Sequence, residues 1–197
     1  MGIGEIGPGR RRAVFLDRDG VINRAPLRDG LPHPPERLEE LRVLPGVRRA
    51  LERLRQAGFL LIVVTNQPDV ARGSQQRDTV EAINRALCAR LPLDDLRVCY
   101  HDDVDGCDCR KPQPGLLLEA ARDWGIDLAA SYMVGDRWQD IEAGRRAGCR
   151  TVLIDRHYAE VCRAVPDRVA RSLPAAVDWI LSSAVSIPGN LSARCMP

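Results

Sequence analysis

The chain has 197 residues, of which 45% are hydrophobic and 28% charged, a composition typical of a globular protein and not of a disordered one. The formal net charge of only +2 does not favour a nucleic-acid-binding surface. No apolar run is long enough to span a membrane, and no signal-type apolar stretch follows the N-terminus, so we expect a cytoplasmic protein. In that reducing compartment, seven cysteines argue against a disulfide framework.

Apolar strand-like segments alternate with helical ones along the chain. In chain order we expect a strand at 13–16, a helix at 45–58, a strand at 59–67, a helix at 77–91, a strand at 96–101, a helix at 115–125, a strand at 131–136, a helix at 137–148, a strand at 150–155 and a terminal helix at 175–185. The unbroken apolar run at 59–67 is typical of a parallel strand buried on both faces. The alternation predicts an α/β fold with a central parallel sheet.

Polar residues follow several of these segments at the point where a strand ends or a helix begins. They are Asp17, Asp19, Thr65, Asn66, Lys111 and Asp136. Because ligands of parallel sheets bind at the carboxyl ends of the strands, we expect these side chains to meet at one edge. Taken singly, an aspartate there can be a helix cap and Thr65-Asn66 a turn. Their joint placement favours a functional site.

The chemistry of this group indicates phosphate hydrolysis. Three carboxylates at one edge repel one another unless a cation lies among them, and all-oxygen ligation suits Mg²⁺, which often takes phosphate as a further ligand. The pair Asp17 and Asp19 can divide the reaction. Asp17 attacks phosphorus and forms an aspartyl-phosphate, while Asp19 protonates the leaving oxygen and then deprotonates water. The backbone carbonyl of Asp19 is expected to help hold the metal.

A second group of candidate ligands lies in the segment 99–109. Four soft or borderline ligands fall within eleven positions, with Gly106 to allow a turn: Cys99, His101, Cys107 and Cys109. A disulfide knot and a chance grouping of buried thiols are the alternatives. The spacing favours a tetrahedral Zn²⁺ site, which is structural because four protein ligands leave no open position. We expect this zinc loop to hold Arg110 and Lys111 at the mouth of the site.

Four segments in this order resemble the motifs of the haloacid dehalogenase superfamily of phosphatases, over about residues 13–155: "FLDRDGVIN", "VVTNQ", "RKPQPG" and "VGDRWQD". The zinc loop before "RKPQPG" is similar to that of the D-glycero-D-manno-heptose 1,7-bisphosphate phosphatase family and of the related histidinol-phosphate phosphatases. The resemblance implies a Rossmann-like, three-layer, doubly wound parallel sheet without a large cap domain. We expect one phosphatase domain over 1–197, with its core at about 13–180 and a flexible tail at 184–197.

The resemblance also implies roles for individual residues. Asp17 is the nucleophile, Asp19 the acid and base, and Thr65 and Lys111 stabilise the transferring phosphoryl group. The implied magnesium ligands are Asp17, Asp19 and Asp136. The implied substrate contacts are Asn66, Gln67, Pro68, Arg110 and Arg137. The reaction implied is removal of the 7-phosphate of the heptose bisphosphate by a monomeric enzyme with structural zinc.

The substrate is the least constrained part of this interpretation. The segment at 24–40 lacks the Gly-Tyr pair common in the family, and the segment after "VARG" lacks an aromatic residue. His33 is expected to be a surface loop residue, with substrate contact as the alternative. A histidinol-phosphate phosphatase and a non-catalytic, zinc-stabilised binding module stay open as rival functions, although the retained acidic residues and Lys111 count against the module.

Overall fold

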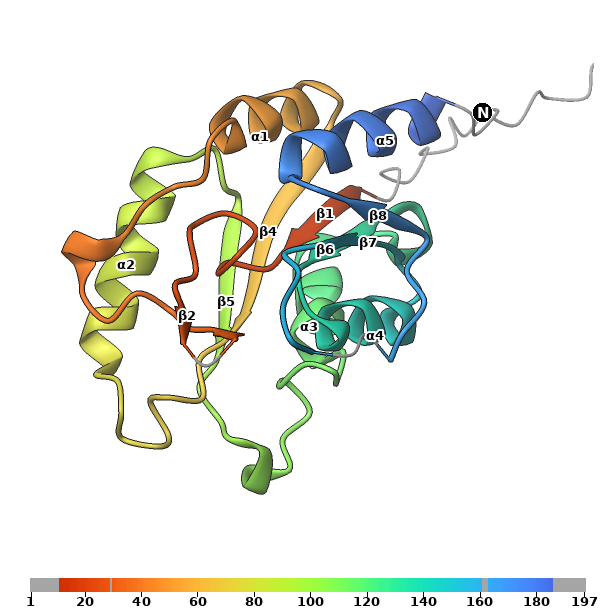
Figure 1. The fold of residues 1–197 in the computed structure, drawn as a ribbon. Helices are drawn as coiled ribbons and strands as arrows, with labels where there is room; N and C mark the ends of the chain where they lie inside the picture. Colours follow the sequence, from red (N-terminus) through yellow and green to blue (C-terminus); the bar gives the residue numbers. More distant parts are fainter. Residues whose placement is uncertain (1–10, 29, 161–162, 186–197) are drawn as a thin grey trace, which may run out of the picture.

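The computed structural model describes residues 11–28, 30–160 and 163–185. A six-stranded sheet crosses the molecule in the order β5-β4-β1-β6-β7-β8, and every neighbouring pair is parallel (Figure 1). Its strands are β1 (Arg12–Leu16), β4 (Phe59–Asn66), β5 (Asp95–Cys99), β6 (Tyr132–Gly135), β7 (Arg150–Ile154) and β8 (Arg168–Ala170). This is the doubly wound order of Rossmann-like proteins, which confirms the predicted α/β fold.

Helices cover both faces of the sheet. One face packs against α1 (Val47–Gln56), α2 (Arg77–Arg90) and α5 (Leu173–Val185), and the other against α3 (Gly115–Trp124) and α4 (Trp138–Ala147). Side chains of β1 alternate between the two layers: Val14 and Leu16 join the first core, Ala13 and Phe15 the second. Burial on both faces explains why the central strands are apolar at consecutive positions.

The connections on the side that carries the candidate site contain only small elements. Between β1 and α1 lie the hairpin β2 (Leu27–Arg28) and β3 (Leu31–Pro32) and the 3-10 helix η1 (Leu38–Glu40). Ten residues, 67–76, separate β4 from α2. Within the described part of the chain, therefore, no large cap domain is inserted, as predicted.

The differences from the predicted elements lie at edges and ends. The predicted strand at 96–101 stops at Cys99, because Tyr100 and His101 turn into the Cys-rich loop, the segment 99–109 that was predicted to bind zinc. The hairpin and the three-residue edge strand β8 were not predicted. Helix α5 continues to Val185, and the rest of the predicted flexible tail, 186–197, lies outside the described residues. No helix in the described ranges is long and apolar enough to cross a membrane.

Candidate active site

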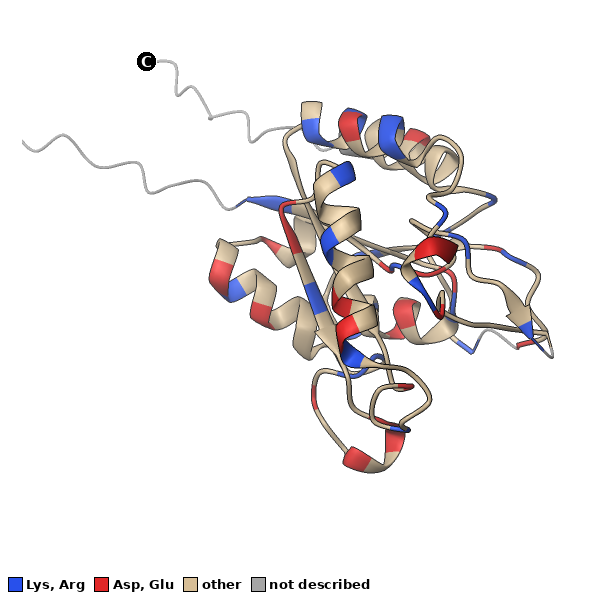
Figure 2. Cartoon of the chain, turned by 90° about the vertical axis from the view of Figure 1, so that its left-hand side faces the viewer, with Lys and Arg blue, Asp and Glu red and all other residues tan. Residues whose placement is uncertain are grey.

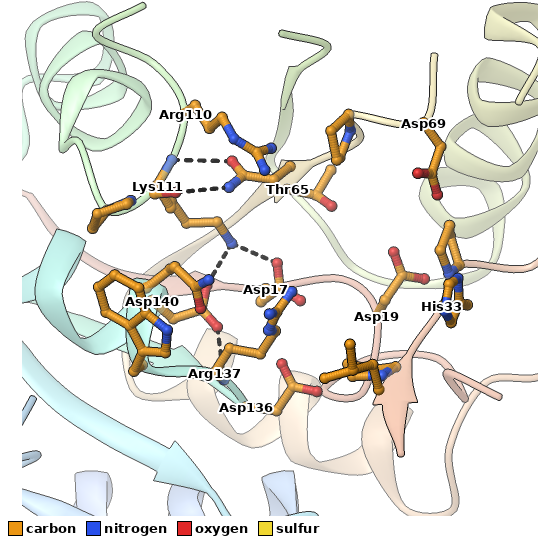
Figure 3. A pocket seen from close by; sticks show the side chains of 18 of the residues that line it. Asp17, Asp19, His33, Thr65, Asp69, Arg110, Lys111, Asp136, Arg137 and Asp140 are labelled. Carbon is orange, nitrogen blue, oxygen red and sulfur yellow. Dashed lines mark hydrogen bonds and ion pairs between the residues drawn. The ribbon is translucent and has the colours of Figure 1, made fainter. Parts of the chain in front are cut away.

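The strand ends bring the predicted polar residues to one pocket of about 450 Å³ at the carboxyl edge of the sheet (Figure 3). Asp17 follows β1, Thr65 and Asn66 end β4, and Asp136 follows β6. These elements are adjacent in the sheet, so residues far apart in sequence line one cavity. Rim residues from the hairpin and the Cys-rich loop, among them His33, complete its wall. His33 lines the pocket, so substrate contact, the predicted alternative for this residue, stays a prediction.

Lys111 lies at the centre of the pocket floor. Its Nζ is 2.5 Å from Asp17 Oδ1 and 2.6 Å from Asp140 Oδ1, and it donates to the carbonyl oxygen of Val64 at 2.8 Å (Figure 3). The residue is 3% exposed, so this is a buried ion-paired group. All three N–H bonds of the ammonium group therefore have an acceptor.

Burial dominates the electrostatics of the floor. It raises the pKa of Asp17 to about 7, although the positive charge of Lys111 opposes the rise. Burial and the nearby charge of Asp17 raise the pKa of Asp136 well above its ordinary value. Burial alone would lower the pKa of Lys111, but Asp140 and Asp17 more than offset it and raise that pKa. One lysine does not balance three buried carboxylates, and a divalent cation would.

Asp140 is a site residue that the sequence interpretation missed. It lies in the first turn of α4, where its Oδ2 also accepts from the backbone N–H of Arg137 at 3.0 Å. A Cβ on Gly135 would come within 2.0 Å of the Cβ of Asp140, so the helix approaches the strand only because residue 135 is glycine. The signal was available in "GDRWQD", an acidic residue four positions after Asp136.

Carboxylate oxygens of Asp17, Asp136 and Asp140 lie within 4.8 Å of one another, and all three residues are buried. This all-oxygen donor set fits Mg²⁺. The cluster shares Asp17 and Asp136 with the predicted ligand set and has the carboxylate of Asp140 in place of that of Asp19. A ligand role for the Asp19 backbone carbonyl stays a prediction.

The Asp19 carboxylate has a different environment. Its Oδ2 accepts from the Arg18 guanidinium at 2.8 Å and from Gln67 Nε2 at 2.9 Å, and its Oδ1 accepts from Asn23 Nδ2 at 2.8 Å. Asp19 still lines the pocket, with 15% of its side chain exposed. A carboxylate held this firmly at the pocket wall is in a position to exchange a proton with a bound leaving group.

Of the four residues at the end of β4 and directly after it, three line the pocket and one does not. Thr65, Asn66 and Pro68 line the pocket, whereas the Gln67 side chain turns inward and donates to Asp19 and to Thr65 Oγ1, both at 2.9 Å. The Asn66 amide donates to the carbonyl oxygen of Lys111 at 3.0 Å and accepts from its backbone N–H at 3.1 Å. Asn66 thus holds the backbone of Lys111 in place, and Gln67 holds the side chains of Asp19 and Thr65 in the pocket wall. The predicted substrate contacts of these residues remain predictions.

The Cys-rich loop extends beyond the lower end of the sheet, and its 3-10 turn η2 (Asp103–Asp105) is acidic (Figures 1 and 2). The Sγ of Cys109 is 3.0 Å from that of Cys99 and 3.4 Å from that of Cys107, and His101 Nδ1 lies 3.3 Å from Cys109 Sγ. Ligand atoms of all four residues fall within 4.8 Å of one another. Three sulfurs and one imidazole at this separation fit a single zinc ion.

The two arginines predicted to contact the substrate are both held by carboxylates. Arg110 Nε is 2.6 Å from Asp103 Oδ1 in the Cys-rich loop. Arg137 makes two contacts with Glu160, at 2.8 and 3.0 Å. Both arginines line the pocket. The sequence interpretation missed Glu160, which lies 23 positions after Arg137 and has no periodicity to mark it.

Arg72 is a further rim residue that the sequence interpretation missed. It pairs with Asp102 at 2.8 and 2.5 Å, and so ties the loop after β4 to the Cys-rich loop. Its side chain lines the same pocket as Arg110. The pocket therefore combines a buried acidic floor with a rim where guanidinium groups alternate with carboxylates. With a divalent cation to balance the floor, that arrangement would suit an anionic group on the floor and a second polar group near the mouth.

Comparisons with known proteins agree with this geometry. The family model described as HAD-hydrolase-like matches residues 108–176. The D-glycero-beta-D-manno-heptose-1,7-bisphosphate 7-phosphatase of Rhodopseudomonas palustris is 39% identical over 152 residues, 71% of this chain and 81% of that protein. The Escherichia coli K12 protein of the same name is 34% identical over 94% of this chain and 96% of its own length.

A solved structure is similar over nearly the same extent. It is the D,D-heptose 1,7-bisphosphate phosphatase of B. bronchiseptica, complexed with magnesium and phosphate. It superposes with a TM-score of 0.73 at 34% identity, and the match covers 87% of this chain and 99% of that one. The similarity therefore extends over most of the chain.

Proposed function

The chain belongs to the phosphatases of the haloacid dehalogenase superfamily, in the heptose-1,7-bisphosphate 7-phosphatase family, and on that premise we propose that it removes the 7-phosphate of D-glycero-D-manno-heptose 1,7-bisphosphate. The position of Asp17 supports this activity most directly. Its carboxylate lies on the pocket floor 2.5 Å from the Lys111 ammonium group, where a phosphoryl group would meet both. The products are heptose 1-phosphate and inorganic phosphate.

The proposed reaction has two displacements at phosphorus. A carboxylate oxygen of Asp17 attacks, the bond from phosphorus to the sugar oxygen breaks, and Asp19 donates a proton to that oxygen. Asp19 then takes a proton from water, the water oxygen attacks phosphorus, and the bond from phosphorus to Asp17 breaks. Lys111 and the Thr65 hydroxyl stabilise the negative charge on the phosphoryl oxygens throughout. Both displacements leave Asp17 and Asp19 as they began.

Magnesium is the proposed catalytic cofactor, held by the carboxylates of Asp17 and Asp136, with Asp140 beside them and the backbone carbonyl of Asp19 as a further ligand. The oxygen donor set and the uncompensated negative charge of the floor support it. When bound, the ion supplies positive charge to the phosphate group. The related B. bronchiseptica structure contains magnesium and phosphate, which supports the same assignment.

Zinc is proposed as a structural ion held by Cys99, His101, Cys107 and Cys109. The loop that these residues enclose has little apolar surface to bury, and Val104 at its tip is 91% exposed. A metal would therefore supply much of its folding free energy. Ordering this loop also fixes Arg110, which directly follows Cys109 in the chain.

The proposed second phosphate of the substrate would bind near Arg110. A planar, permanently charged guanidinium group suits bidentate contact with an oxyanion. The acidic pair Asp102 and Asp103 would otherwise attract an amine such as histidinol phosphate, but Arg72 and Arg110 already neutralise it. A phosphate that replaces Asp103 at Arg110 would therefore favour the bisphosphate over the rival substrate. We further propose one phosphatase domain, active as a monomer.

Turnover of the two substrates under one set of conditions tests the proposal. We expect kcat/KM for the heptose 1,7-bisphosphate to exceed that for histidinol phosphate by at least about tenfold, the effect of one well-placed charged contact. Both anomers of the bisphosphate should be assayed, with release of inorganic phosphate as the readout. Equal values for the two substrates would reject the assignment while leaving the phosphatase activity standing.

A further inference from the structure

The segment after β7, residues 155–160, runs beside the active site with alternating burial. Arg156, Tyr158 and Glu160 are partly buried, while His157 and Ala159 are exposed. Each inward side chain contacts an element of the site. Arg156 Nε donates to the carbonyl oxygen of Gly20 at 2.8 Å, Tyr158 reaches Asp136, and Glu160 holds Arg137. Three contacts in five residues make this segment part of the wall of the site.

The contact of Tyr158 is with a proposed magnesium ligand. Its hydroxyl donates to Asp136 Oδ2 at 2.6 Å. Among the described residues no other side chain donates a hydrogen bond to that carboxylate. Gly20 also borders this oxygen: an added Cβ there would come 1.7 Å from it and 2.8 Å from the Tyr158 hydroxyl. The glycine backbone and the phenol therefore both limit how this carboxylate oxygen can move.

The backbone that leads to Tyr158 is held by the edge of the sheet. The backbone N–H of Asp155 donates to the carbonyl oxygen of Ala170 in β8 at 2.9 Å. Asp155 Oδ1 then accepts from the backbone N–H of His157 at 2.8 Å and fixes a left-handed residue, with φ of 57°. This local turn directs the next side chain, Tyr158, toward the pocket. The phenol is thus placed before any ligand binds.

We infer that Tyr158 is a positioning residue for the magnesium site. Its hydrogen bond occupies one oxygen of Asp136 and fixes the rotation of the carboxylate, so that the other oxygen is presented to the ion. Partners of this kind contribute about 10- to 100-fold to metal affinity in characterised sites. This role rests on the proposed function, since it requires magnesium at Asp136.

The test is the affinity of Tyr158→Phe for Mg²⁺, measured by titration calorimetry on protein freed of magnesium by gel filtration. We expect the dissociation constant to rise about tenfold, because the ring remains and only the hydroxyl is lost. The magnesium concentration that gives half-maximal turnover should rise by the same factor, while kcat at saturating magnesium stays within about twofold of wild type. Zinc content and melting temperature should not change.

Two variants serve as controls. Tyr132→Phe makes the same chemical change at the opposite end of β6, where the hydroxyl accepts from Arg150 at 3.2 Å, and should leave magnesium affinity unchanged. Glu160→Gln disturbs the same segment without touching Asp136 and should also leave it unchanged. A loss in Glu160→Gln as large as that in Tyr158→Phe would overturn the assignment to Tyr158.

Two outcomes separate this role from the proposed function. If the wild type binds Mg²⁺ and Tyr158→Phe binds it equally well, the inference is wrong and the proposed metal stands. If the wild type does not bind Mg²⁺ under conditions that support turnover, the proposed cofactor and this inference both fail. A selective loss in Tyr158→Phe supports both.

Discussion

The floor of the active site and the zinc loop at its mouth are built in opposite ways. The floor takes Asp17, Lys111, Asp136 and Asp140 from four separate elements and buries them. The loop takes its four ligands from eleven consecutive positions and remains largely exposed. The floor therefore depends on the sheet, whereas the loop depends on the proposed metal. The proposed chemistry, which requires fixed geometry, thus lies at the sheet, and the proposed substrate contact of Arg110 lies at the end of the loop.

Asn66 joins the two regions. It belongs to β4 of the sheet, and its amide makes two hydrogen bonds to the backbone of Lys111, which follows the zinc loop. The Arg72–Asp102 ion pair makes a second connection at the rim. Changes that act on the floor alone, on the loop alone or on the connection between them should therefore have different signatures.

The largest effect is expected on the floor. Asp17→Asn should lower kcat by several orders of magnitude, because an amide is a poor nucleophile toward phosphorus. The melting temperature and zinc content should stay near wild type, since the sheet and the loop are untouched. Phosphate release and thermal unfolding measure the two quantities. Asp178→Asn, on the outer surface of α5, is the control. A variant with a tenth of wild-type kcat would disprove the mechanism.

Loss of a ligand in the zinc loop should act mainly on the thermal stability of the protein. Purified protein should contain about one zinc per chain by elemental analysis. Cys107→Ser should lose the metal and lower the melting temperature by about 5–10 °C, corresponding to about 2–3 kcal/mol for a chain of this size. Turnover should fall with it, because Arg110 and Lys111 follow the loop. Cys88→Ser, at an exposed cysteine of α2, should change neither quantity. Full stability without zinc would contradict a structural ion.

A change at Asn66, which connects the two regions, should lower kcat without loss of zinc. Asn66→Ala removes both hydrogen bonds to Lys111, so the ammonium group loses its fixed position. We expect kcat to fall about tenfold, equivalent to about 1.4 kcal/mol, with zinc content unchanged. Asn66→Asp keeps the acceptor for the Lys111 N–H and should recover part of the loss. An unchanged kcat in both variants would mean that the contacts of the Lys111 ammonium group are enough to hold it in place without the hydrogen bonds from Asn66.

The most limited effect is expected at the mouth, where only one of two substrates should be affected. Arg110→Ala should lower kcat/KM for the bisphosphate about tenfold and leave that for a monophosphate nearly unchanged. The effect is limited because Asp103 already pairs with the guanidinium group, and a phosphate must replace that contact. Steady-state kinetics on both substrates measure the ratio. An equal loss on both would place the discrimination elsewhere, for example in the β2–β3 hairpin.

The sequence predicts one of these regions more completely than the other. The zinc ligand set follows from spacing alone, because its members are neighbours in the chain. The floor was predicted from the rule that ligands of parallel sheets bind at the carboxyl ends of the strands, which placed Asp17, Thr65 and Asp136 together. The rule missed Asp140, because an acidic residue in the first turn of a helix equally indicates a cap, and Asp140 does cap the helix.

Other features could not be predicted from the sequence, for physical reasons. The β2–β3 hairpin has two residues per strand and β8 has three, too few for a period to be recognised. Gln67 lies in a motif that suggests phosphate contact, yet its side chain turns inward because Asp19 and Thr65 accept from it. Pairs such as Arg137–Glu160 depend on how irregular segments fold back, and hydrophobic periodicity carries no information about them.

Lys111 has one further property: it is the only lysine among the 29 basic residues of the chain, and all the others are arginine. Its compact ammonium group directs three N–H bonds at two carboxylates and the Val64 carbonyl, a tetrahedral arrangement that differs from the planar fork of a guanidinium group. An amine-directed reagent consequently has one side-chain target in the whole protein, and that target is 3% exposed. The rate of labelling at this amine would report how often the floor of the active site opens to solvent.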